Sequence, residues 1–103
     1  MVILGVAERV HDSRQTVKHD DLEIRSVYVG DHKAVFVNVT ATGAESGGFV
    51  TLYGGGHVPN VSNLNFQKGK DICNASWVPV QDGHISVYTY GRVDLVIDKQ
   101  AVV

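Results

Sequence analysis

The chain is predicted to be all-β: a small antiparallel β-sandwich or barrel of about seven to eight short strands. First, β-branched apolar runs alternate with Gly-rich and Asn-rich connections through residues 34–66. Second, turn signals recur at intervals of roughly eight to twelve residues. Third, no window of about 11 residues sustains a helical period.

The first half of the chain divides into four predicted strands. These are Val2–Val6, Leu22–Val29, Ala34–Thr42 and Phe49–Tyr53. The polar segment His11–Asp21 is expected to be a loop. In the third strand Val35, Val37 and Val39 alternate with Ala34 and Phe36, so both faces are apolar, and we expect a central strand covered on both sides.

The second half is predicted to hold a long loop or short strand and three further strands. The loop spans His57–Lys70, and the strands are Ile72–Val80, Ile85–Tyr90 and Val93–Ile97. Pro79 lacks a backbone donor, which places the end of its strand at a sheet edge. Gln81-Asp82-Gly83 is typical of a hairpin turn, because Asp-Gly tolerates the positive φ values that such turns need.

Length and composition indicate a single domain over residues 1–103 with one hydrophobic core. The chain is 44% apolar and 19% charged, as in ordinary globular proteins. A formal charge of -2 argues against nucleic acid as a partner. No stretch approaches the length of a membrane span, and no export signal is recognisable. The single cysteine, Cys73, has alternating apolar neighbours and is expected to be a buried, inert thiol.

Several motifs occur in a characteristic order. They are Val10-His11-Asp12-Ser13-Arg14, Ala34-Val35-Phe36-Val37-Asn38-Val39-Thr40-Ala41-Thr42, Gly48-Phe49-Val50-Thr51-Leu52-Tyr53, Pro59-Asn60-Val61-Ser62-Asn63-Leu64-Asn65-Phe66 and Gly69–Asn74. In these motifs the chain resembles a β-domain repeated in secreted multi-domain proteins of actinobacteria. That domain carries Asp-Thr-Arg, Asn-Val-Thr and Ser-Asn-Leu-Asn-Phe motifs, and phages of these bacteria carry similar modules. His11 departs from the pattern, which has an apolar residue there. The resemblance implies a surface or adhesive module and supplies no catalytic residues.

Asp12 and Arg14 match the Asp-x-Arg of that pattern. The planar fork of Arg14 could clamp an anionic ligand, but we favour a structural role, in which Arg14 is paired with Asp12 or Asp98 and pins the entry loop. Sequence alone leaves both interpretations open.

Three asparagines, Asn60, Asn63 and Asn65, form a second group of structural or ligand candidates. Amide side chains can hydrogen-bond sugars, and they can equally satisfy backbone groups of an irregular loop. Tyr88 and Tyr90 are possible surface aromatics on one face of their strand, whereas Trp77 is expected in the core. The spacing of the five histidines predicts no metal site, and no motif predicts a cofactor.

The sequence therefore favours a non-catalytic structural protein of an actinobacterial phage virion, either a capsid decoration or a tail component. Its expected partners are capsid or tail proteins and further copies of itself. The alternative is a carbohydrate- or cell-wall-binding module of a secreted protein, located at the cell surface and binding a host glycan. An enzyme is not expected, because no nucleophile–base or carboxylate pair is suggested.

Two structural expectations accompany this interpretation. Phe36, Val35, Val37, Val39, Leu52 and Ile85 should be largely buried. The apolar ends, Val2-Ile3-Leu4 and Ala101-Val102-Val103, are expected to be free tails, at least one of which docks on another subunit or on a shell protein.

Overall fold

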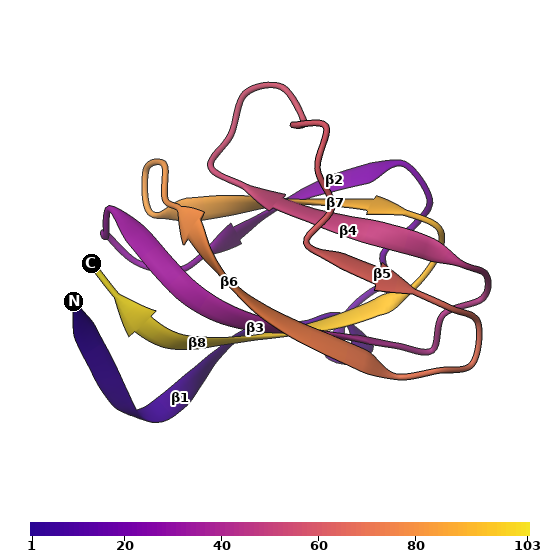
Figure 1. Ribbon diagram of the computed structural model, residues 1–103, viewed down its shortest axis with the longest axis horizontal. Coiled ribbons are helices and arrows are strands. Elements are labelled where there is room, and N and C mark those ends of the chain that lie inside the picture. The colour runs from indigo at the N-terminus through magenta and orange to yellow at the C-terminus, as the bar shows by residue number, and fades with distance from the viewer.

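The computed structural model describes residues 1–103 and contains two four-stranded antiparallel sheets that face each other as a sandwich (Figure 1). The strands are β1 (Val2–Asp12), β2 (Glu23–Tyr28), β3 (Ala34–Thr42), β4 (Gly48–Tyr53), β5 (Leu64–Phe66), β6 (Ile72–Pro79), β7 (His84–Tyr90) and β8 (Asp94–Val102). The first sheet has the order β1-β8-β3-β6, and the second has the order β2-β7-β4-β5. A single 3-10 turn, η1 (Ser13–Gln15), follows β1. The predicted all-β sandwich is confirmed.

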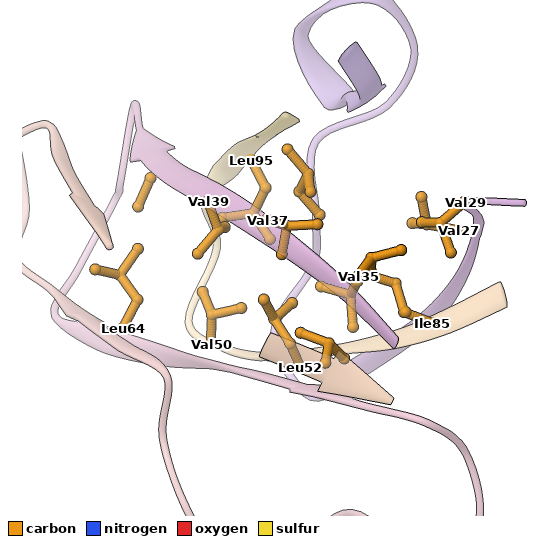
Figure 2. Close-up of a cluster of buried hydrophobic side chains, with 14 of the residues drawn as sticks. Val27, Val29, Val35, Val37, Val39, Val50, Leu52, Leu64, Ile85 and Leu95 are labelled. Carbon is orange, nitrogen blue, oxygen red and sulfur yellow. The ribbon is translucent and has the colours of Figure 1, made fainter. Parts of the chain in front are cut away.

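The core lies between the two sheets and follows from strict alternation along the strands (Figure 2). On β3, Val35, Val37 and Val39 point inward and are completely buried. They face side chains of the second sheet such as Val50 and Ile85. Because successive residues of a strand point to opposite faces, one face of each sheet builds the core and the other faces outward.

The outward face of the first sheet corrects four expectations. Phe36 is only half-buried, because its neighbours Val35 and Val37 occupy the inward positions. No layer covers its outer side, so β3 is buried on one face and not on both. Trp77 and Cys73 lie on the edge strand β6 and are exposed, Trp77 to 43%. Period-2 alternation was visible in the sequence, but it does not say which face meets the second sheet.

Both ends of the chain belong to the first sheet. β1 runs on to Asp12, past its predicted end at Val6 and into the start of the segment expected to be a loop, because residues 8–12 pair with β8. β8 runs on to Val102, and Ala101 and Val102 are buried between β1 and β3. The C-terminal apolar residues are therefore part of an interior strand and do not form a free tail. The two termini lie side by side (Figure 1).

Turn chemistry agrees with the sequence at the β6–β7 connection. Asp82 and Gly83 adopt φ values of 52° and 77°, the left-handed pair of a two-residue hairpin turn. The backbone N–H of His84 donates to the carbonyl of Gln81 at 3.0 Å and closes this turn. Asp-Gly at these positions thereby turns the chain from β6 of the first sheet into β7 of the second.

Candidate functional site

A groove on the outer face of the second sheet brings together two of the predicted candidates, Asn60 and Tyr88. Its sheet side is formed by Phe49 on β4 and Tyr88 on β7, and its other side by loop residues 58–62, which include Asn60. The groove has a volume of about 550 Å³. That volume lies in the range of small-molecule sites, and the mixture of aromatic walls with a few polar groups is typical of them.

The loop between β4 and β5 forms one wall of the groove because it is tied back across β4. The hydroxyl of Thr51 donates to the carbonyl of Val61 at 2.6 Å, and the N–H of Leu52 donates to Oδ1 of Asn63 at 2.7 Å. The side chain of Asn74 adds a bond to the Asn63 carbonyl at 2.8 Å. Asn63 therefore anchors the loop, which is the structural role that asparagine often has in irregular backbone.

Asn60 and Asn65 differ from Asn63 because both are exposed. Asn60 lines the groove. Asn65 lies on β5 directly opposite Phe49, and Tyr90 lies opposite Phe49 on the other side. The outer face therefore carries a cross-strand row of Tyr90, Phe49 and Asn65.

Three aromatic rings lie next to one another on this face. The rings of Phe49 and Tyr90 are stacked, with centroids 5.3 Å apart and an angle of 5° between their planes. The ring of Phe49 lies 6.1 Å from that of Tyr88, tilted by 53°. Tyr90 is 50% exposed. The predicted pair of tyrosines thus shares one face, and Phe49, which sequence reasoning left out, connects them.

Asp12 and Arg14 lie apart from this groove, at the end of β1. Nε and Nη2 of Arg14 each donate to a carboxylate oxygen of Asp12 at 2.9 Å, and the Arg14 backbone N–H donates to the same carboxylate at 3.1 Å. Hydrogen bonds from the Arg14 guanidinium lower the pKa of Asp12 to about 2. Asp98 is instead the partner of Arg9, at 3.0 Å. Because the guanidinium of Arg14 is occupied by Asp12, this geometry fits the structural interpretation.

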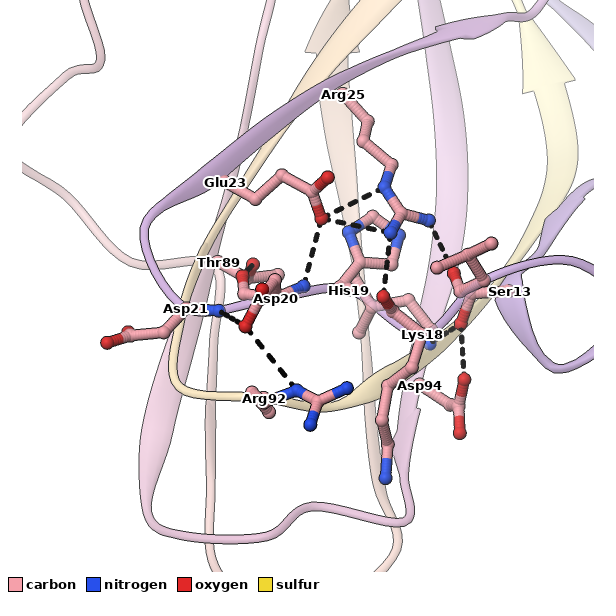
Figure 3. A network of polar contacts seen from close by, with 12 residues as sticks. Ser13, Lys18, His19, Asp20, Asp21, Glu23, Arg25, Thr89, Arg92 and Asp94 are labelled. Carbon is pink, nitrogen blue, oxygen red and sulfur yellow. Dashed lines mark hydrogen bonds and ion pairs between the residues drawn. The ribbon is translucent and has the colours of Figure 1, made fainter.

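A second polar cluster joins the two sheets beside η1 (Figure 3). Ser13 donates to the Asp94 carboxylate at 2.8 Å and accepts from the N–H of Leu95 at 2.9 Å. Arg25 on β2 donates to the carbonyls of Val17 and Lys18 at 2.6 and 2.7 Å. These bonds hold the segment that crosses from the first sheet to the second.

His11 and His19 meet in this cluster, with 2.8 Å between their Nε2 atoms. His19 is fully buried, and its Nδ1 has no hydrogen-bond partner. The hydrogen-bond network assigns the shared proton to Nε2 of His19, because Nδ1 then carries no buried unpaired N–H. Burial, with the nearby Arg25 cation, lowers the pKa of His19 to about 3. His11 therefore has a partner of its own residue type.

The outer face of the first sheet carries an apolar row that crosses all four strands. Ile3 pairs with Ala101, Ala101 with Phe36, and Phe36 with Trp77. Ile3 is 72% exposed, and the rings of Phe36 and Trp77 have centroids 5.3 Å apart. Met1 joins these residues around a hollow of about 360 Å³. We call this set, Met1, Ile3, Phe36, Trp77 and Ala101, the apolar row.

Polar residues border the apolar row. Arg9, Asp98 and Asn38 occupy the neighbouring cross-strand positions, and Arg9 is ion-paired to Asp98. The alternation in the sequence already contained the apolar residues and the polar residues beside them. Only the pairing of β1, β8, β3 and β6 brings each set into line across the sheet. An apolar patch rimmed by polar groups is typical of a protein interaction surface.

No group of three or more His, Cys, Asp or Glu side chains is arranged to hold a metal ion. No helix of the molecule has the length and apolar character needed to cross a bilayer. The chain matches no protein-family model, no curated protein and no solved structure.

Proposed function

We propose that this domain is a non-catalytic structural protein of an actinobacterial phage virion, a capsid decoration or tail component that attaches to particle subunits through the apolar row. The exposed apolar row is the observation that carries the proposal. An aromatic and aliphatic strip that faces water is unfavourable for an isolated monomer, and burial against a partner stabilises the complex. The resemblance to actinobacterial surface modules supports the choice of partner.

The edge strand β1 extends the same surface. It pairs with β8 on one side only, so the backbone groups on its other side are free to pair with another chain. Between Ile3 and Glu8 it also leaves the register of β8, and Val6 in this bulge is 85% exposed. A stable interface buries about 800 Å² on each partner, more than a single row of side chains supplies. The proposed interface therefore includes both the apolar row and β1, which lies beside it in the first sheet.

Attachment in this mode requires no catalytic group. Burial of Trp77 and Phe36 would supply the central contacts, since buried aromatic anchors dominate most interfaces. The ion pair of Arg9 with Asp98 would remain at the polar rim. The same surface also fits a second copy of the chain, so self-association is part of the proposal.

The experiment is co-sedimentation of purified domain with phage particles assembled without it. Trp77→Ser should abolish or strongly weaken attachment, because it removes the largest exposed side chain of the apolar row. Tyr28→Ser is the matched control, since Tyr28 is 65% exposed but lies on the second sheet. Sedimentation velocity of the free domain reports self-association in parallel.

Equal attachment of wild type and Trp77→Ser would show that the apolar row is not the docking surface. Failure of the wild-type domain to sediment with the particles would contradict the virion role itself. Loss of attachment in Tyr28→Ser alone would move the docking surface to the other sheet.

A further inference from the structure

We infer that the groove between Phe49, Tyr88 and loop residues 58–62 is a binding site for a neutral oligosaccharide. It lies on the sheet opposite to the apolar row, so the inference does not depend on the attachment proposed above. A domain that docks with one sheet leaves the other sheet facing outward, where it can meet a ligand.

The chemistry of the walls selects the ligand class. No Asp, Glu, Lys, Arg or His side chain lines the groove. Phe49 and Tyr88 offer ring surfaces, and Asn60 and Ser62 offer amide and hydroxyl groups. A pyranose matches this combination, because it has an apolar C–H face and hydroxyl groups around its edge. A charged ligand would lose hydration here without gaining a counter-charge.

The shape of the surface favours a chain of sugars over a single one. Beyond the groove, the ring of Tyr90 stacks on Phe49, and the side chain of Asn65 lies opposite Phe49 on β5. Both residues are exposed and lie outside the groove. They lie on opposite sides of Phe49, so this row adds one further ring and one further amide to those of the groove. One sugar would occupy the groove, and the next would lie beside it along the row of Tyr90, Phe49 and Asn65.

The position of the loop is fixed before any ligand arrives. Thr51 and Asn63 tie loop residues 61–63 to β4 through bonds of 2.6 and 2.7 Å. A wall that is already ordered loses little entropy on binding, which favours a preformed site. Asn63 is therefore a positioning residue, whereas Asn60 is expected to touch the ligand.

The test is an NMR titration of the full chain with four neutral disaccharides: cellobiose, maltose, lactose and N,N′-diacetylchitobiose. Digalacturonic acid serves as a charged comparator. Each sugar is taken to about 50 mM, which covers the millimolar dissociation constants expected for an open groove. At least one neutral sugar should shift the backbone amides of Phe49, Tyr88 and residues 58–62, and the acidic sugar should not.

Tyr88→Ala should weaken that binding roughly 3- to 10-fold, in line with the loss of one stacked ring. Asn60→Ala should weaken it by a similar factor through a lost hydrogen bond, and it lies on an exposed loop, so the fold is preserved. Tyr28→Ala is the matched control: an exposed tyrosine of the same sheet that does not line the groove, for which affinity should be unchanged.

Three results would overturn the inference: no shift with any neutral sugar, shifts confined to residues outside the groove, or preferential binding of the acidic sugar. Unchanged affinity in both Tyr88→Ala and Asn60→Ala would also overturn it. None of these results bears on particle attachment, which is read from the opposite sheet.

Discussion

Acidification should destabilise this protein through His19, well above the pH at which carboxylates are protonated. His19 is fully buried, and its pKa falls from the ordinary value of 6.5 to about 3. A folded-state pKa below the unfolded one means that the unfolded chain binds the proton more tightly. Stability from this residue is therefore present above pH 6.5 and is lost as the pH falls toward 3.

The size of the effect follows from the two pKa values. Between these two pKa values, each unit of decrease in pH lowers the free energy of unfolding by about 1.36 kcal/mol for one proton. At pH 5 the loss relative to pH 7 is about 2 kcal/mol, and at pH 4 it is about 3 kcal/mol. These are large fractions of the roughly 5–15 kcal/mol by which domains are stable.

Several charged groups face the histidine pair. Arg25 and His11 oppose protonation of His19, and Glu23 favours it, but burial is the largest cause. The pKa of His11 is lowered as well, by burial and by Arg25. His11 therefore also takes up a proton on unfolding, and this makes the free energy of unfolding fall more steeply as the pH decreases. The lowered pKa values of Asp12 and Glu23 affect stability only below about pH 4.5.

The assay is urea unfolding at pH 7, 6, 5 and 4, compared between the wild type and His19→Gln. Glutamine keeps a donor toward His11 but cannot take up a proton, so its free energy of unfolding should fall less steeply between pH 6 and 5. His57→Gln controls for the loss of an exposed imidazole. Equal slopes in the wild type and His19→Gln would refute the reasoning, as would an NMR titration that placed the pKa of His19 above about 5.

Three further outcomes can be checked on the same protein. Ile85→Ala should lower the free energy of unfolding by about 3–4 kcal/mol in chemical denaturation, because Ile85 is completely buried. Phe36→Ala should lower it by less than about 1.5 kcal/mol, because the Phe36 ring faces outward. Equal losses in the two variants would contradict the assigned faces. Arg14→Ala should lower the thermal midpoint slightly and should not affect sugar or particle binding; a specific binding loss would make Arg14 a ligand residue. Cys73 should react fully with a thiol reagent without denaturant, and protection of the native thiol would show that it is buried after all.

Alternation along the strands made most of the fold predictable. Ala34–Thr42 has the predicted bounds, and the hairpin at Asp82-Gly83 follows from the φ values that only a few residues tolerate. The extra length of β1 and β8 was not predictable, because polar residues such as His11 and Asp98 interrupt the apolar alternation of these paired strands. Cross-strand pairing, and not local composition, extends those strands.

The sequence did not reveal which face of each strand turns toward the core, and Phe36 and Trp77 show why. Each lies in an apolar stretch, and each was expected in the core. A sheet has two faces of identical period, so the alternation along one strand does not say which face meets the second sheet. In β3 the three valines fill the thin interior, and the bulky Phe36 is left outside next to Trp77.

The candidate sites also depend on which face of each strand is turned outward. Tyr88 and Tyr90 were predictable as a pair because they are two residues apart on one strand. Their connection through Phe49, and the return of loop residues 58–62 over β4, require long-range pairing that no local pattern records. His11 and His19 likewise meet only because β1 and the crossing segment fold against each other.

The two outer faces differ in chemistry, and the difference bears on how the domain works. The apolar row on the first sheet has few groups that need hydrogen bonds, so a flat protein surface can cover it without leaving buried polar atoms unpaired. The groove on the second sheet combines rings with amides and hydroxyls, which a small hydroxylated ligand can satisfy one by one. Because the sandwich core separates the two faces, occupation of one leaves the other accessible. A particle-bound domain would therefore keep its sugar affinity, and Trp77→Ser and Tyr88→Ala should act independently in the two assays.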